Sequence, residues 1–382
     1  KRRNEEGIKP ALPLLEKILK IKNVEDLNNN LKELTLLNVD LPFNCGIEPD
    51  MKDATKNSFM ILGPSIILPD TTYYAEDNPS GKALLGIFAQ MASSLLALTP
   101  LSQEEQQQFV KDTLEFDAMI AKVVKSQVEW ADYVQNYNPQ SIEEVANQLK
   151  PLDFVGFLKE FYGENGPKQI IVADPRAIKE FHTYFNEENF EKYLHWAYVN
   201  ALLRASTFLS EEIHTIGTTF RRTMYGIAKD PVLEKQAYQL VGRVYSEPIG
   251  VYYGRTYFGE EAKKDVVDMV KRIIKTYKKR MKDNRFLAEE TKEKAILKLS
   301  TIEIYEKLKV NEEDSLLESM GKITEFKILR NLNELNEPVD RTKWGMPGHM
   351  VNACYNPSSN DITFPAAILQ APFYSLKQSL SE

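Results

Sequence analysis

VNACYNPSSNDITFPAAILQAPFY, residues 351–374, combines two short β-type runs, 351–356 and 362–364, in one stretch of sequence. The Pro-Ser-Ser-Asn sequence at 357–360 separates the two runs and is typical of a tight turn. Pro365 ends the second run or confines it to the edge of a sheet, because proline cannot donate a ladder hydrogen bond. An exposed strand edge can accept an extended peptide through main-chain hydrogen bonds. The stretch therefore predicts a β-hairpin with a candidate peptide-binding edge.

Upstream of this hairpin, apolar residues recur at helical spacing over most of the chain. Ser102 followed by Glu105, and Ser141 followed by Glu144, predict capping boxes at two helix starts. Three of the longer helices are expected at residues 189–209, 231–243 and 261–283.

Strand-like residues cluster outside the hairpin in a few places only. The runs 59–62 and 66–68 predict a two-stranded excursion, and 170–172 predicts a further strand. No internal repeat of fixed length is present, which disfavours a solenoid. The expected fold class is mainly α with a small β component.

Composition excludes several classes of protein. The 382 residues carry 48 Lys and Arg against 55 Asp and Glu, a formal charge of −7, so a nucleic-acid partner is not expected. Two cysteines rule out a disulfide scaffold. The longest uncharged stretch, 83–100, contains polar residues and is too short to span a bilayer, so no membrane partner is expected.

No catalytic or metal site follows from the residue types alone. The four histidines never occur as His-x-x-x-His, the spacing that places two imidazoles on one helix face for zinc. The basic run 271–282 is interpreted as the solvated face of an amphipathic helix. Cys354 is predicted to point inward from its strand as a packing residue rather than to act as a nucleophile.

The hairpin sequence is similar to a known family. Asn352-Ala353-Cys354-Tyr355 resembles the Asn-Ala-x-Tyr motif of the neprilysin-like (M13) zinc metallopeptidases, and residues 362–374 resemble the segment that follows it. The Ala-Cys-Tyr and Pro-Ala-Ala-Ile variants are most similar to the bacterial oligopeptidase O branch. A weaker resemblance covers most of the chain.

The resemblance implies an architecture. Residues 1–30 would be a catalytic-side or linker segment, 31–255 a large helical cap domain that encloses the substrate cavity, and 256–382 linker helices and the start of a thermolysin-like α+β catalytic domain. The family binds one zinc ion through a His-Glu-x-x-His motif, which is expected downstream of Glu382, and the family's N-terminal opening is also not in this chain. No catalytic residue or metal ligand is therefore expected among these 382 residues.

The resemblance also implies substrates and binding residues. A closed cavity admits oligopeptides, which the complete enzyme would cleave on the amino side of bulky hydrophobic residues. Asn352 and Ala353 would bind the substrate backbone, and Ile368 and Phe373 would line the apolar S1′ pocket. The remaining catalytic portion of the same protein would be a partner of this segment.

Location and the rival hypothesis also follow from the sequence. A bacterial cytoplasmic location is expected from the low cysteine content and the lack of Asn-x-Ser/Thr sequons, with secretion or the cell surface as the alternative. The rival hypothesis is a non-catalytic, helical peptide-binding module without a zinc site.

Overall fold

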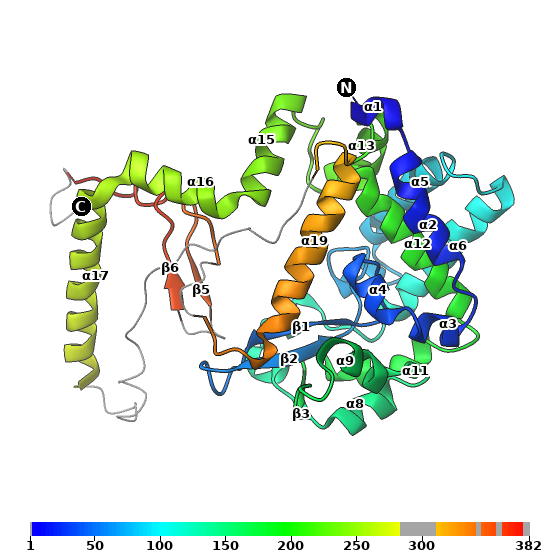
Figure 1. Ribbon diagram of the computed structural model, residues 1–382, viewed down its shortest axis with the longest axis horizontal. Helices are drawn as coiled ribbons and strands as arrows, with labels where there is room; N and C mark the ends of the chain where they lie inside the picture. The colour runs from blue at the N-terminus through cyan, green and yellow to red at the C-terminus, as the bar shows by residue number, and fades with distance from the viewer. Residues whose placement is uncertain (1, 283–310, 341–344, 357–360, 377–382) are drawn as a thin grey trace. The chain divides into compact units, whose positions relative to one another are not determined.

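The computed structural model describes residues 2–282, 311–340, 345–356 and 361–376 (Figure 1). The chain divides into two compact units. Unit 1 comprises Lys1–Glu48, Lys56–Asp230 and Glu306–Pro338, and unit 2 comprises Pro49–Thr55, Pro231–Tyr305 and Val339–Glu382. Described helical residues far outnumber described strand residues, which confirms the predicted fold class, mainly α with a small β component.

Unit 1 is built around two long helices, α6 (Gln103–Ala121) and α12 (Phe190–Ser206), which pack along each other. Helix α12 buries residues on most of its circumference, including Tyr193, Trp196 and Tyr198. A helix that is apolar nearly all round belongs in the interior of a domain. The other α-helices of this unit are α1 Arg2–Glu6, α2 Leu12–Leu19, α3 Val24–Asn28, α4 Leu31–Leu36, α5 Pro79–Leu96, α7 Gln127–Trp130, α8 Ile142–Gln148, α9 Phe154–Tyr162, α10 Pro175–Lys179, α11 Phe181–Tyr184, α13 Glu211–Gly217, α14 Thr219–Met224 and α19 Leu316–Asn333.

The helix starts of unit 1 are capped as the sequence predicts. Ser102 accepts from the Glu105 N–H while the Glu105 carboxylate accepts from the Ser102 N–H, and Ser141 and Glu144 repeat this arrangement at α8. Both predicted capping boxes are confirmed. Each satisfies two backbone donors that the helix itself leaves unpaired.

A small mixed sheet lies within unit 1. Its strands are β1 (Asn44–Pro49), β2 (Asn57–Leu62), β3 (Pro139–Gln140) and β4 (Ile170–Val172), in the order β1-β2-β4-β3. Strands β2 and β4 run parallel, with Phe59 opposite Ile170, and β3 runs antiparallel to β4. The predicted strands at 59–62 and 170–172 are confirmed.

The predicted pairing partner of 59–62 is wrong. Residues 66–68 form no strand, and β2 instead pairs with β4 and is flanked by β1 on its other side. The N–H groups of Ile67 and Leu68 donate to side chains, Oδ1 of Asp117 and the Tyr74 hydroxyl. Because these side chains satisfy the backbone of 66–68, the segment has no need of a sheet partner.

Unit 2 contains three helices, a short π-helical turn and one hairpin among its described residues. They are α15 (Leu233–Val244), α16 (Ser246–Tyr253), the π-helix η4 (Gly254–Phe258), α17 (Gly259–Lys282), β5 (Cys354–Asn356) and β6 (Asp361–Thr363). The predicted helices at 189–209, 231–243 and 261–283 correspond to α12, α15 and α17 within a few residues at each end. The first 30 residues belong to the same compact unit as most of the segment 31–255.

Candidate substrate-binding site

The predicted hairpin forms as a two-stranded antiparallel sheet of unit 2. Strand β5 pairs with β6 so that Cys354 faces Thr363 and Tyr355 faces Ile362. Strand β6 ends two residues before Pro365, as expected for a residue that cannot continue the ladder. The predicted turn at 357–360 lies outside the described residues.

Asn352 and Ala353 lie immediately before β5 rather than within it. Asn352 is exposed and Ala353 is half-buried. The Asn352 N–H donates to the Met350 carbonyl (3.1 Å), and the Ala353 N–H donates to Oδ1 of Asn352 itself (2.8 Å). In this state, the main-chain donor predicted to bind substrate is satisfied by the neighbouring side chain. A substrate carbonyl that bonds to Ala353 has to replace the Asn352 amide oxygen.

Ile368 and Phe373 lie in a turn-rich segment that follows β6. The Ile368 N–H donates to the Pro365 carbonyl (3.2 Å), and the Phe373 N–H donates to the Gln370 carbonyl (2.8 Å). Ile368 is half-buried, whereas the Phe373 side chain is 65% exposed. Phe373 therefore presents an apolar surface that the described residues leave largely uncovered.

Tyr374 anchors this segment to helix α17, a role that the sequence analysis did not identify. Its hydroxyl donates to Oδ2 of Asp265, and its ring lies 6.5 Å from that of Phe258, centroid to centroid. Burial, together with the hydrogen bond to the Asp265 carboxylate, raises the pKa of Tyr374 to about 12. The signal in the sequence was the adjacent pair Phe373 and Tyr374, because neighbouring side chains can point in opposite directions. Phe373 is exposed, and Tyr374 is buried.

The prediction that Cys354 packs inward is wrong. Cys354, Tyr355 and Asn356 are all exposed. Alternation along a strand places a side chain inward only where another layer covers one face of the sheet. Among the described residues, no such layer buries any of these three side chains.

The described residues do not form a zinc site. They contain no group of three or more His, Cys, Asp or Glu side chains that could hold a metal ion. Two histidines in unit 1 have other partners: Nδ1 of His195 lies 2.6 Å from Oδ2 of Asp112, and Nδ1 of His214 lies 3.0 Å from the Thr207 carbonyl oxygen. The zinc ion that the resemblance implies therefore does not fit the residues described.

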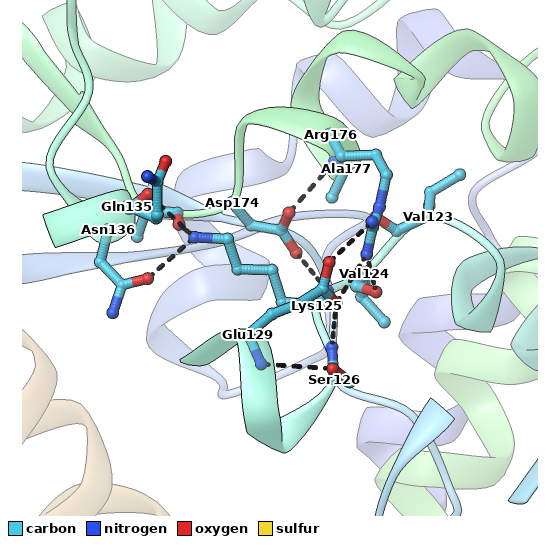
Figure 2. Close-up of polar contacts among 11 residues, drawn as sticks. Val123, Val124, Lys125, Ser126, Glu129, Gln135, Asn136, Asp174, Arg176 and Ala177 are labelled. Carbon is cyan, nitrogen blue, oxygen red and sulfur yellow. Dashed lines mark hydrogen bonds and ion pairs between the residues drawn. The ribbon is translucent and has the colours of Figure 1, made fainter. Parts of the chain in front are cut away.

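A polar cluster lies in unit 1, just beyond the C-terminal end of β4. Figure 2 shows its side chains. Lys125 Nζ donates to the carbonyl oxygens of Gln135 (3.0 Å) and Ala173 (2.8 Å) and to Oδ1 of Asn136 (2.8 Å). The Lys125 N–H donates to the buried Asp174 carboxylate (3.0 Å). All three protons of the ammonium group are thus used within the protein, which indicates a structural role rather than ligand binding.

The same cluster includes an ion pair with favourable geometry. Arg176 donates to both carboxylate oxygens of Glu129 (2.9 and 3.0 Å) and to the carbonyl oxygens of Val123 and Val124 (2.8 Å each). The Arg176 guanidinium group lowers the pKa of Glu129 to about 2. Together the contacts fix the segment from Val123 to Asn136 against the start of α10 (Figure 2).

No helix within the described ranges has the length and apolar character needed to cross a lipid bilayer.

Comparison with known proteins places these features in a family. Residues 1–306 match the N-terminal sequence model of Peptidase family M13, and residues 352–381 match a second model with the same family description. The chain is 37% identical to the neutral endopeptidase of Lactobacillus helveticus over 99% of its own length and 60% of that protein's length. It is 33% identical to a putative zinc metalloproteinase of Streptococcus gordonii, over 100% of this chain and 69% of that protein.

A solved structure has the same fold. The crystal structure of PEPO from Lactobacillus rhamnosis HN001 superposes with a TM-score of 0.90 at 30% sequence identity, covering 99% of this chain and 62% of that one. The chain therefore spans about 60% of the length of the neutral endopeptidase that it matches. The two family models, the sequence relatives and the shared fold agree: this chain belongs to peptidase family M13.

Proposed function

We propose that this chain supplies the cap and the substrate-backbone-binding strand of a zinc metalloendopeptidase that hydrolyses short peptides. The proposal is supported by family membership and by relatives whose names are neutral endopeptidase and putative zinc metalloproteinase. The observation that carries it is the segment directly before β5, in which Asn352 is exposed and its side chain accepts a hydrogen bond from the Ala353 N–H. An extended peptide can add to such an edge through its main chain.

The domain roles in this proposal follow the predicted ranges. Residues 31–255 form the cap that limits substrate size, and 256–382 begin the catalytic domain. Residues 1–30, which pack within unit 1, form the linker to the catalytic side. The zinc ligands and the general base lie outside the 382 residues, because the described residues fit no metal ion and the sequence contains no His-Glu-x-x-His. The rest of the catalytic domain is then the partner of unit 2, and a bacterial cytoplasm is the proposed location.

Substrate preference belongs to the same proposal. Ile368 and Phe373 contact the side chain that follows the scissile bond, and their apolar surfaces favour a bulky hydrophobic residue there. The backbone of the peptide is held by the Asn352 amide and by the main chain of Ala353. Binding of the Ala353 N–H to substrate requires rotation of Asn352, since the two are hydrogen-bonded to each other without substrate.

The first experiment is the intact mass of the purified natural protein together with its zinc content and its hydrolysis of a peptide library. A mass well above 43.8 kDa, one zinc ion per chain and cleavage before bulky apolar residues are expected. A protein of natural length that contains no zinc and cleaves no peptide would instead support the non-catalytic peptide-binding module.

The second experiment replaces Asn352 in the complete protein. We expect Asn352→Ala to lower kcat/KM by a factor that corresponds to about 1–3 kcal/mol of lost transition-state stabilisation, because a hydrogen bond to the substrate backbone is lost in the transition state. The Asn336→Ala variant, which loses a side-chain hydrogen bond to the Asn165 carbonyl oxygen, is the control. Wild-type kinetics for Asn352→Ala would contradict its assigned role.

A further inference from the structure

Two glycines that are distant in sequence touch backbone to backbone in unit 2. A Cβ atom added to Gly250, which is buried on α16, would lie 2.6 Å from the Gly348 nitrogen and 3.3 Å from its Cα. A Cβ atom added to Gly348 would lie 2.8 Å from the Gly250 carbonyl oxygen. The distances of 2.6 and 2.8 Å are shorter than real Cβ contacts, and the opposing atoms are backbone, which cannot rotate away. Only glycine fits on both sides of this contact.

Gly348 is also bonded to one half of the candidate substrate site. Its carbonyl oxygen accepts from the Ala367 N–H (3.0 Å), and Ala367 is a buried residue directly before Ile368. This bond connects the loop before β5 to the turn-rich segment that carries Ile368 and Phe373.

The other half of the site follows Gly348 along the chain. The Met350 N–H donates to the Pro347 carbonyl (3.0 Å), and the Asn352 N–H donates to the Met350 carbonyl (3.1 Å). Two consecutive hydrogen-bonded turns therefore lead from Gly348 to Asn352. Gly348 is therefore connected to Asn352 through these turns and to the Ile368 segment through its own carbonyl oxygen.

We propose that the Gly250–Gly348 contact fixes the spacing between the two halves of the site. The backbone-binding half is Asn352 and Ala353, and the side-chain-binding half is Ile368 and Phe373. The inference rests on the proposed function, because it concerns how that site selects its peptide. A peptide held by its backbone at one half presents its side chain correctly to the other half only when the spacing between them is fixed.

The test compares two Gly→Ala substitutions four residues apart in the complete protein. Gly250→Ala forces the new methyl group against the Gly348 backbone. Gly254→Ala is the matched control, since its Cβ would lie 3.9 Å from the Ala366 Cβ, an ordinary contact, and Gly254 has a helical φ of −60°. Each variant is assayed with two peptides that differ only in having Phe or Ala after the scissile bond.

The measured quantity is the ratio of kcat/KM for the Phe peptide to that for the Ala peptide. A loss of folded enzyme lowers both kcat/KM values equally and leaves their ratio unchanged. The ratio therefore depends on the spacing of the two halves of the site and not on the stability of the protein. We expect Gly250→Ala to lower the ratio by roughly fivefold or more and Gly254→Ala to leave it within about twofold of wild type. A Gly250→Ala enzyme with the wild-type ratio would overturn the inference.

Two further outcomes are distinguishable from these. A wild-type protein that cleaves neither peptide overturns the proposed function, and the inference with it. If Gly250→Ala does not fold, hydrogen exchange of the wild-type protein decides: the Ala367 amide is expected to exchange slowly because it is bonded to Gly348. Rapid exchange at Ala367 would show that the two halves are not connected and would overturn the inference.

Discussion

The two compact units differ in how completely they bury their own apolar residues. Unit 1 encloses a continuous core in which large side chains such as Phe116, Tyr184 and Trp196 are almost fully buried. In unit 2, by contrast, many large apolar side chains are exposed: Val232, Leu233, Tyr238, Val241, Tyr245, Tyr252, Tyr257, Met269, Val351, Tyr355, Ile362, Phe364, Phe373 and Leu376. Such extended apolar exposure is typical of surfaces that bind another molecule or domain. Unit 1 therefore covers its large apolar side chains within its own core, whereas unit 2 leaves many of its described ones exposed.

The test with the largest expected effect makes the same substitution, Phe→Ala, once in each unit. Phe116 is completely buried, and its ring contacts those of Tyr184, Tyr193 and Trp196. We expect Phe116→Ala to lower the free energy of unfolding by about 3–5 kcal/mol, since the transfer free energy of the ring is lost and a cavity remains. Urea unfolding followed by tryptophan fluorescence measures the change.

Phe373→Ala in unit 2 is the counterpart of that substitution. Because the Phe373 side chain is already 65% exposed, its removal is expected to change the free energy of unfolding by less than about 0.5 kcal/mol. Similar stability losses in the two variants would show that unit 2 has a core of its own around Phe373. The comparison between the units would then be wrong.

The sequence predicted unit 1 better than the hairpin region, for a physical reason. Helices, caps and the buried strands 59–62 and 170–172 depend on local patterns and on apolar side chains that the unit itself covers. The partner of β2 could not be predicted, because the choice between 66–68 and β4 depends on Asp117 and Tyr74, whose side chains satisfy the backbone of 66–68 from elsewhere in the fold.

In the candidate site, the sequence identified the family but not the placement of individual side chains. The motif at Asn352–Tyr355 identified the family, and the family models confirm this resemblance. The exposure of Cys354 was not predictable, because alternation along a strand does not reveal which face another layer will cover. The Gly250–Gly348 contact was not visible in the sequence either, since it joins residues that are almost 100 positions apart.

A second test concerns the polar cluster that stabilises unit 1. We expect Lys125→Met to lower the free energy of unfolding by about 1–3 kcal/mol, because the carbonyl oxygens of Gln135 and Ala173 and Oδ1 of Asn136 lose a charged donor. Lys122→Met, at an exposed position three residues earlier, is the control and is expected to change it by less than about 0.5 kcal/mol. Equal effects of the two substitutions would mean that the cluster does not contribute to the stability of unit 1.

The smallest expected effect, taken as the change per pH unit, is a pH dependence confined to unit 1. Asp117 is completely buried, and it accepts hydrogen bonds from the Tyr74 hydroxyl and the Ile67 N–H. Burial raises its pKa from 3.8 to about 7 despite these two donors, which favour the ionised form. Between pH 4 and 7, the folded protein therefore keeps a proton that the unfolded chain has released.

The sign of this pH dependence follows from proton linkage. Because the unfolded state binds fewer protons than the folded state in this range, the free energy of unfolding decreases as the pH rises, by at most about 1.4 kcal/mol per pH unit, and levels off above about pH 7. Asp117→Asn removes the titrating group, so the difference in unfolding free energy between wild type and variant should change over the same range. Urea unfolding at pH 5, 6, 7 and 8 measures it, with the exposed Asp77→Asn as the control. A wild-type profile parallel to that of Asp117→Asn would show that the carboxyl group is already ionised in the folded protein. The core of unit 1 would then enclose a charged carboxylate that is stabilised by hydrogen bonds from the Tyr74 hydroxyl and the Ile67 N–H.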